Sequence, residues 1–164
     1  MIEKEILHFK IGLSSSTSRK SPEFIIRIND KEFINSKLNE DFKTTQYFEF
    51  DAELDEGPNN LEIEFLNKLD EDFVKEVKGN NQIELIDDLL LNIDSIEIDE
   101  IELATLKWSK SIYKPIYSED YVKWCKRNKV ELKEEVLNCV NLGWKGSWNL
   151  PFESPLYVWL IENI

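Results

Sequence analysis

Carboxylates clustered between apolar runs are the residues of this sequence whose type and spacing suggest chemistry most directly. Calcium takes several hard oxygen ligands, and carboxylates in loops at strand ends can supply them. The acids here lie directly after or between apolar runs, although the EF-hand pattern is absent. A calcium site is therefore one interpretation, and an acidic, solvated surface is the other. The candidate calcium ligands are Asp70, Asp72, Asp87 and Asp88.

The same carboxylates are also candidates for a catalytic pair, since glycosidases hold two carboxyl groups about 5–10 Å apart across a cleft. No pair of acids stands out by its position. His8 is the only histidine, and no serine or cysteine motif accompanies it. Cys125 and Cys139 lie too far apart in the chain for a CxxC pair, and buried thiols are the simplest interpretation. We therefore expect a non-catalytic protein, with an acidic hydrolase as an outside alternative.

The tryptophans all lie in the last third of the chain. Trp144 and Trp148 lie in a loop segment with two glycines, Gly143 and Gly146, and exposed aromatic side chains in such loops stack on sugar rings or anchor interfaces. These two residues are the candidate ligand-binding pair. Leu156, Tyr157 and Trp159 lie in an apolar stretch, which we interpret as a core strand or as an interface with a partner subunit.

The charge is acidic and uneven along the chain. Thirty-three acidic and 20 basic side chains give a formal net charge of -13, and residues 51–103 alone hold 18 acids and 3 bases. Phosphate backbones and anionic membrane surfaces repel such a chain, so we expect neither nucleic acid nor a membrane as a partner. No apolar run reaches the roughly 18 residues that span a bilayer. An acidic decoy that mimics nucleic acid is a further alternative.

Alternation of apolar and polar residues with a period of two predicts several short strands. The clearest run is residues 61–65, after a predicted turn at residues 55–60, and residues 24–28 and 96–98 alternate in the same way. Asp99-Glu100 interrupts the pattern, which predicts a bulge or a tight corner. No helix-length periodic segment lies between these strands, so a parallel α/β fold is disfavoured. We predict an all-β fold, an antiparallel β-sandwich of jelly-roll type.

The C-terminal third adds a short helix, because Ser118 is a good N-cap for a segment that ends near Asn128. Residues 130–140 fit either a helix or a strand, of which we favour the strand. Residues 148–152 and 156–161 are predicted as extended pieces. We expect a single domain over residues 1–164, since no linker divides it. Its acidic, β-rich part is residues 1–107, and its Trp-rich tail, residues 108–164, packs on that part.

The ending Ser154-Pro155-Leu156-Tyr157-Val158-Trp159-Leu160-Ile161-Glu162-Asn163-Ile164 resembles that of a group of small structural proteins in tailed, marine T4-like phages. The resemblance implies a non-catalytic β-sandwich that is carried on the virion. It also implies other virion proteins, a second copy or a host-surface glycan as partners. The sequence starts without the features of a signal peptide and has two cysteines, which fits synthesis in the host cytoplasm.

Residues 60–67 and 95–103 are loosely similar in layout to xylan-binding-type carbohydrate-binding modules, in which a strand leads into an acidic loop and then into an isoleucine-rich strand. This resemblance implies the alternative function, a calcium-dependent carbohydrate-binding domain. Its cofactor is then Ca²⁺, held by the four aspartates named above, with sugar oxygens completing the shell of the metal.

Overall fold

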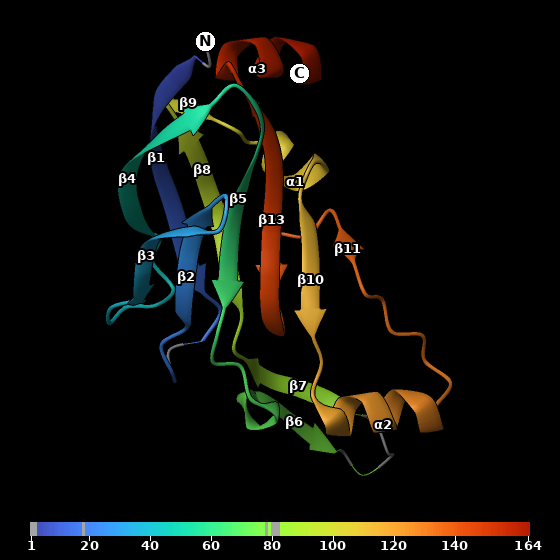
Figure 1. Ribbon diagram of the computed structural model, residues 1–164. Helices are drawn as coiled ribbons and strands as arrows, with labels where there is room; N and C mark the ends of the chain where they lie inside the picture. Colours follow the sequence, from blue (N-terminus) through green and yellow to red (C-terminus); the bar gives the residue numbers. More distant parts are fainter. Residues whose placement is uncertain (1–2, 18, 78, 80–82) are drawn as a thin grey trace.

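Two antiparallel sheets packed face to face dominate the computed structural model, which describes residues 3–17, 19–77, 79 and 83–164 (Figure 1). Sheet A has the strand order β12-β8-β1-β4, with β9 paired to β8. Sheet B has the order β11-β10-β13-β5-β2-β3, and β6 and β7 form a separate ribbon at the lower end in Figure 1. The predicted all-β sandwich is therefore confirmed.

The elements have the following bounds. Sheet A consists of β1 (Lys4–Ser15), β4 (Gln46–Asp55), β8 (Leu91–Ile98), β9 (Ile101–Glu102) and β12 (Asn141–Leu142). Sheet B consists of β2 (Glu23–Ile28), β3 (Lys31–Lys37), β5 (Gly57–Phe65), β10 (Ile112–Ile116), β11 (Val136–Leu137) and β13 (Lys145–Ser154). The ribbon is β6 (Phe73–Val77) and β7 (Ile83–Asp88), preceded by the 3-10 helix η1 (Asp70–Asp72). The helices are α1 (Leu106–Ser109), α2 (Glu119–Arg127) and α3 (Leu156–Asn163).

The core lies between the two sheets and follows from the period of two. Leu7, Phe9 and Ile11 on β1 are fully buried, because every second side chain of a strand points to the same face. Aromatic rings join the sheets, since Phe9 meets Phe152 of β13 edge-on with ring centroids 6.1 Å apart. Burying such rings is the main favourable term in folding, at roughly 1.5–3 kcal/mol for a large apolar side chain.

Tight turns connect the hairpins. Asn29 and Asp30 between β2 and β3, and Asp99 and Glu100 between β8 and β9, all have positive φ angles of 50° to 68°. Two consecutive residues with positive φ match the twist of the flanking strands, and Asn and Asp adopt that conformation more readily than most residues. The predicted corner at Asp99-Glu100 is therefore confirmed as a tight turn.

Gly146 allows β10 and β13 to approach closely. Its φ is +145°, and a Cβ built on it would lie 2.3 Å from the carbonyl oxygen of Lys114. Any other residue at this position would push β10 away from β13. The glycine is therefore required for β10 and β13 to pair at this position, opposite Pro115.

The predicted helix after Ser118 is confirmed as α2. The Ser118 side chain accepts a hydrogen bond from the Tyr121 amide at 3.2 Å, and Asn128 is the C-cap. Among the residues described, no helix is long and apolar enough to cross a membrane.

Three local predictions are wrong. The turn predicted at residues 55–60 is shorter, because Gly57–Phe65 already forms β5 and pairs with β13. Residues 130–140 form a strand only at Val136–Leu137, since the charged residues before it follow an exposed, irregular path. Residues 156–161 lie in a helix, α3, rather than in an extended piece.

The spacing of the buried residues explains the helix α3. Leu156, Trp159 and Leu160 are buried, and positions i, i+3 and i+4 lie on one face of a helix. The Trp159 ring packs against Phe152 of β13, with centroids 6.3 Å apart. The exposed residues Tyr157, Val158 and Ile161 are apolar as well, so the sequence of α3 shows no alternation of apolar and polar residues with a helical period.

His8 lies on the outer face of sheet A and bridges two acids of the neighbouring edge strand. Its Nδ1 lies 2.7 Å from Asp51 Oδ1, and its Nε2 lies 3.0 Å from Glu49 Oε1. The hydrogen bonds to Glu49 and Asp51 raise the pKa of His8 above its usual value. A raised pKa in the folded state means that the protonated ring stabilises the fold.

We predict that His8→Gln makes stability less dependent on pH. The stabilisation by His8 is fully present below its unfolded-state pKa of about 6.5 and is lost as the pH rises through the higher folded-state pKa. The wild type should therefore exceed the variant in melting temperature at about pH 5.5, and the gap should close by about pH 9. Melting curves across this range check the prediction, and an equal gap at both ends would contradict it.

Candidate functional site

The aspartates predicted to bind calcium already have cationic partners. Asp72 Oδ2 accepts hydrogen bonds from Lys20 Nζ at 2.9 Å and from the Leu69 amide at 2.8 Å. Asp88 Oδ1 pairs with Lys68 Nζ. The structure thus brings Asp72 and Asp88 into one region and fills their surroundings with ammonium groups.

The other two aspartates do not complete a metal site. Asp87 Oδ2 accepts a hydrogen bond from Thr17 Oγ1 at 2.7 Å and lies 3.7 Å from Arg19 Nη1, while Asp70 is exposed on η1. Calcium needs six to eight oxygens at about 2.3–2.6 Å, and carboxylates that neutralise lysines are poor candidates. Within the described ranges, no group of three or more His, Cys, Asp or Glu residues could hold a metal ion. The four aspartates therefore do not fit calcium.

Helix α2 lies at the lower end of the sandwich in Figure 1. Two aromatic rings of α2 cluster there with rings from the segments before α2 and before β13. We call this cluster the aromatic patch, and it consists of Tyr117, Tyr121, Trp124 and Trp144. The centroid of the Tyr121 ring lies 4.7 Å from that of Trp144 and 6.0 Å from that of Trp124, and the Tyr121 and Trp124 rings are nearly parallel. Tyr117 meets Trp144 edge-on at 5.7 Å.

The local sequence explains how these rings are held. Tyr121 and Trp124 follow the Ser118 cap on α2, and Cys125, at the next position, is buried and anchors the helix. Trp144 is held by its backbone, because the buried Tyr113 hydroxyl donates to the Trp144 carbonyl and accepts from the Trp144 amide at 3.1 Å. The patch is thus mounted on a capped helix and on a loop fixed to sheet B.

The rings of the patch remain accessible. Trp124 is 43% exposed, and the other three rings are half-buried. Tyrosine hydroxyls are protonated at neutral pH, and burial raises the pKa of Tyr117 and of Tyr121 further. The patch therefore combines flat apolar surface with neutral hydroxyl groups.

Trp148 does not belong to this surface, so its expected exposure is wrong. It lies on β13 with its side chain in the core and is fully buried, and its indole N–H donates to the Cys139 carbonyl at 2.8 Å. Strand alternation carries it inward with Leu150 and Phe152. Of the predicted aromatic pair, only Trp144 lies at the candidate site.

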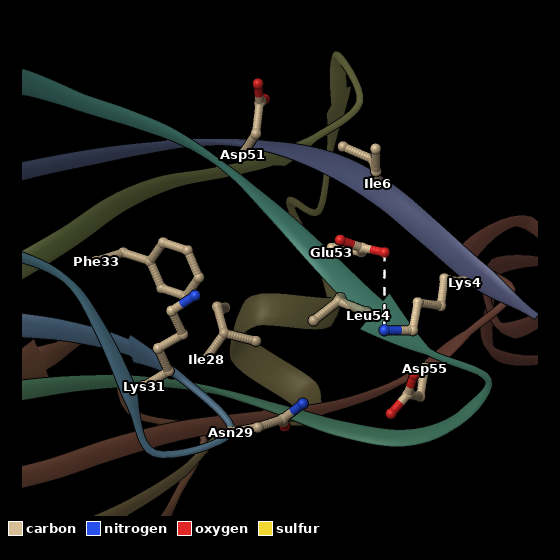
Figure 2. A pocket seen from close by; sticks show the side chains of 10 residues that line it. All are labelled: Lys4, Ile6, Ile28, Asn29, Lys31, Phe33, Asp51, Glu53, Leu54 and Asp55. Carbon is tan, nitrogen blue, oxygen red and sulfur yellow. Dashed lines mark ion pairs between the residues drawn. The ribbon is translucent and has the colours of Figure 1, made fainter. Parts of the chain in front are cut away.

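A groove of about 550 Å³ lies beside the edge strand β4 and the β2–β3 hairpin, and Figure 2 shows its lining. Lys4 and Glu53, on the neighbouring strands β1 and β4, form an ion pair along one side of it at 3.8 Å. Its one aromatic ring, Phe33, stacks on Phe50 at 4.8 Å and lies under the Lys31 ammonium at 5.3 Å. With a single aromatic ring in its lining, the groove offers a flat ligand less aromatic surface than the four-ring patch does.

The predicted interface residues divide between the two faces of α3. Leu156 and Trp159 are buried against the sandwich, whereas Tyr157 is 55% exposed. Val158 and Ile161 are also exposed, so the outward face of α3 is largely apolar, with Glu162 as an exposed charge beside them. A surface helix normally presents polar residues to solvent, so this face is a candidate docking surface.

The comparisons with known proteins point to a fold. No protein-family model and no curated protein matches the sequence. The solved structure of vCBM60 in complex with galactobiose matches with a TM-score of 0.53 and 8% sequence identity, over 87% of this chain and 96% of that one.

A selenomethionine form of vCBM60 matches with a TM-score of 0.53 and 8% identity, over 88% of this chain and 89% of that one. It is described with a circular permutation that links two families of calcium-dependent carbohydrate-binding modules. Both neighbours are carbohydrate-binding modules. At this identity the likeness is one of fold, and it supports the loose resemblance seen in the sequence.

We predict that Tyr113→Phe destabilises the protein by about 1–3 kcal/mol, because it leaves the amide and carbonyl of Trp144 without their buried partner. Urea unfolding measures this loss. Tyr47→Phe is the matched control, since Tyr47 is 53% exposed and its change should stay within about 0.5 kcal/mol. Equal effects of the two substitutions would contradict the proposed anchoring role of Tyr113.

Proposed function

We propose that this protein is a non-catalytic glycan-binding module whose aromatic patch contacts the sugar. The gathering of four aromatic rings on one accessible surface carries the proposal. Sugar rings have apolar C–H faces that pack on flat aromatic rings, and the rings of the patch are prepositioned for this contact. The fold similarity to vCBM60, which is seen in complex with galactobiose, supports the same reading.

Polar groups beside the patch can bind sugar hydroxyls. Asp120, Lys123, Lys126 and Arg127 line a hollow of about 530 Å³ on α2. Asp120 lies four residues before Trp124 and Arg127 three residues after it, so both neighbour Trp124 on the helix surface. A small number of polar groups beside an apolar platform is the usual composition of a ligand site.

Binding to soluble polysaccharides, galactans and xylans included, tests this function. We predict that Trp124→Ala weakens binding by at least about tenfold in calorimetry or affinity electrophoresis, because it removes the most exposed ring of the patch. Trp108→Ala is the matched control, since Trp108 is 50% exposed on α1 and lies outside the patch. No binding by the wild type, or an equal loss in both variants, would contradict the proposal.

A second candidate function, assembly, rests on the apolar outward face of α3. Val158 is 50% exposed, Ile161 74% and Ile164 89%. We propose that this face packs against the same face of a second copy, because a self-complementary apolar helix suits a twofold interface. The phage-like ending supports placing the assembled protein on a virion after synthesis in the host cytoplasm, and this setting stays a proposal.

We predict that wild-type protein is dimeric at micromolar concentration and that Ile161→Lys makes it monomeric, because a buried unpaired charge opposes association. Light scattering coupled to size exclusion measures both states. Lys129→Glu is a control that changes an exposed charge away from α3 and should leave the dimer intact. A monomeric wild type would contradict assembly through α3 without bearing on the aromatic patch.

A further inference from the structure

Two lysines, Lys20 and Lys68, form ion pairs with two of the aspartates that the sequence suggests as calcium ligands. We infer that the ammonium groups of Lys20 and Lys68 are the structural cations of this end of the sandwich, so that the protein folds without a divalent metal. The pairs Lys20–Asp72 and Lys68–Asp88 are called the lysine–aspartate cluster. The inference concerns the cation of the fold and does not depend on the identity of the ligand.

Lys68 carries the strongest part of the argument. Its side chain is 1% exposed, and its ammonium donates to the Leu89 carbonyl at 2.8 Å and pairs with Asp88. An ammonium group this deeply buried is very unfavourable unless oxygens surround it. The Lys68 ammonium therefore lies between a carboxylate oxygen and a carbonyl oxygen, the kinds of atom that bind a metal cation.

Lys20, in the loop before β2, supplies the second ammonium group of the cluster. Its ammonium donates to the Asn67 carbonyl at 2.8 Å and to Asp72 Oδ2 at 2.9 Å, and the Asp72 side chain is only 8% exposed. Leu89 joins the two pairs, since its carbonyl accepts from Lys68 and its amide donates to the Asp72 carbonyl at 3.0 Å. The cluster thus ties the segment after β5 to the segment before β8.

The charges of the cluster are balanced. Two ammonium groups face two carboxylates, and Arg19 lies 3.7 Å from the neighbouring Asp87. A calcium ion would have to enter beside these positive groups, where Coulomb repulsion at short range opposes it. The carboxylates of this cluster are therefore poorly placed to hold a calcium ion, although one fold neighbour is described in connection with calcium-dependent modules.

Thermal melting of the full chain tests the inference directly. The melting temperatures measured with millimolar calcium chloride and with excess EDTA should agree within about 1 °C. A metal that binds only the folded state would instead raise the melting temperature in calcium. A rise that saturates with calcium concentration would overturn the inference. Since no glycan is present, this outcome is separate from the success or failure of the proposed glycan binding.

Variants of Lys68 test whether its ammonium acts as the structural cation. Lys68→Met should lower the melting temperature by roughly 10 °C, because Asp88 is left without its counter-charge. Lys37→Met removes a lysine charge from an exposed position and should change the melting temperature by no more than about 2 °C. A Lys68→Met variant as stable as this control would overturn the role of Lys68.

The double variant Lys68→Met/Asp88→Asn keeps the test decisive if the single variant fails to fold. Removing both charges together should recover part of the lost melting temperature, because residues that form a pair show non-additive effects. A double variant that is no more stable than Lys68→Met would show that the two charges do not compensate each other.

Discussion

The ladder between β5 and β13 is the interaction on which the rest of the structure depends. It runs in register from Gly146 opposite Phe65 to Ser154 opposite Gly57, and so joins the acidic part of the chain to the Trp-rich tail. Because β13 lies in the interior of sheet B, β10 on its other side and α3 at its end take their positions from it. Trp144, directly before β13, is placed by the same ladder.

The strands that could be predicted from the sequence are those with one polar and one apolar face. Leu61, Ile63 and Phe65 alternate with glutamates, so period and burial agree. The helix α3 could not be predicted in the same way, because apolar residues on both of its faces give no helical period. The amphipathic helix α2 could be predicted, because Ser118 and Asn128 mark its two ends in the sequence.

The candidate site was only partly predictable, because its parts come from distant segments. Trp144 could be identified from its glycine loop, but its neighbours Tyr121 and Trp124 lie about twenty residues earlier, and only the fold brings them together. The pairing of the aspartates with lysines could not be predicted for the same reason, since Lys20 is 52 residues from its partner Asp72 in the chain. Carboxylates whose partners are remote resemble metal ligands in a sequence.

The placement of α3 and α2 at opposite ends of the sandwich has a consequence for orientation (Figure 1). A body docked on the apolar face of α3 would cover one pole of the molecule and leave the other pole, with its aromatic rings, pointing outward. The sheets between them act as a rigid spacer, because long antiparallel ladders resist bending. Contacts made at α3 and contacts made at the aromatic patch could therefore occur at the same time without steric conflict.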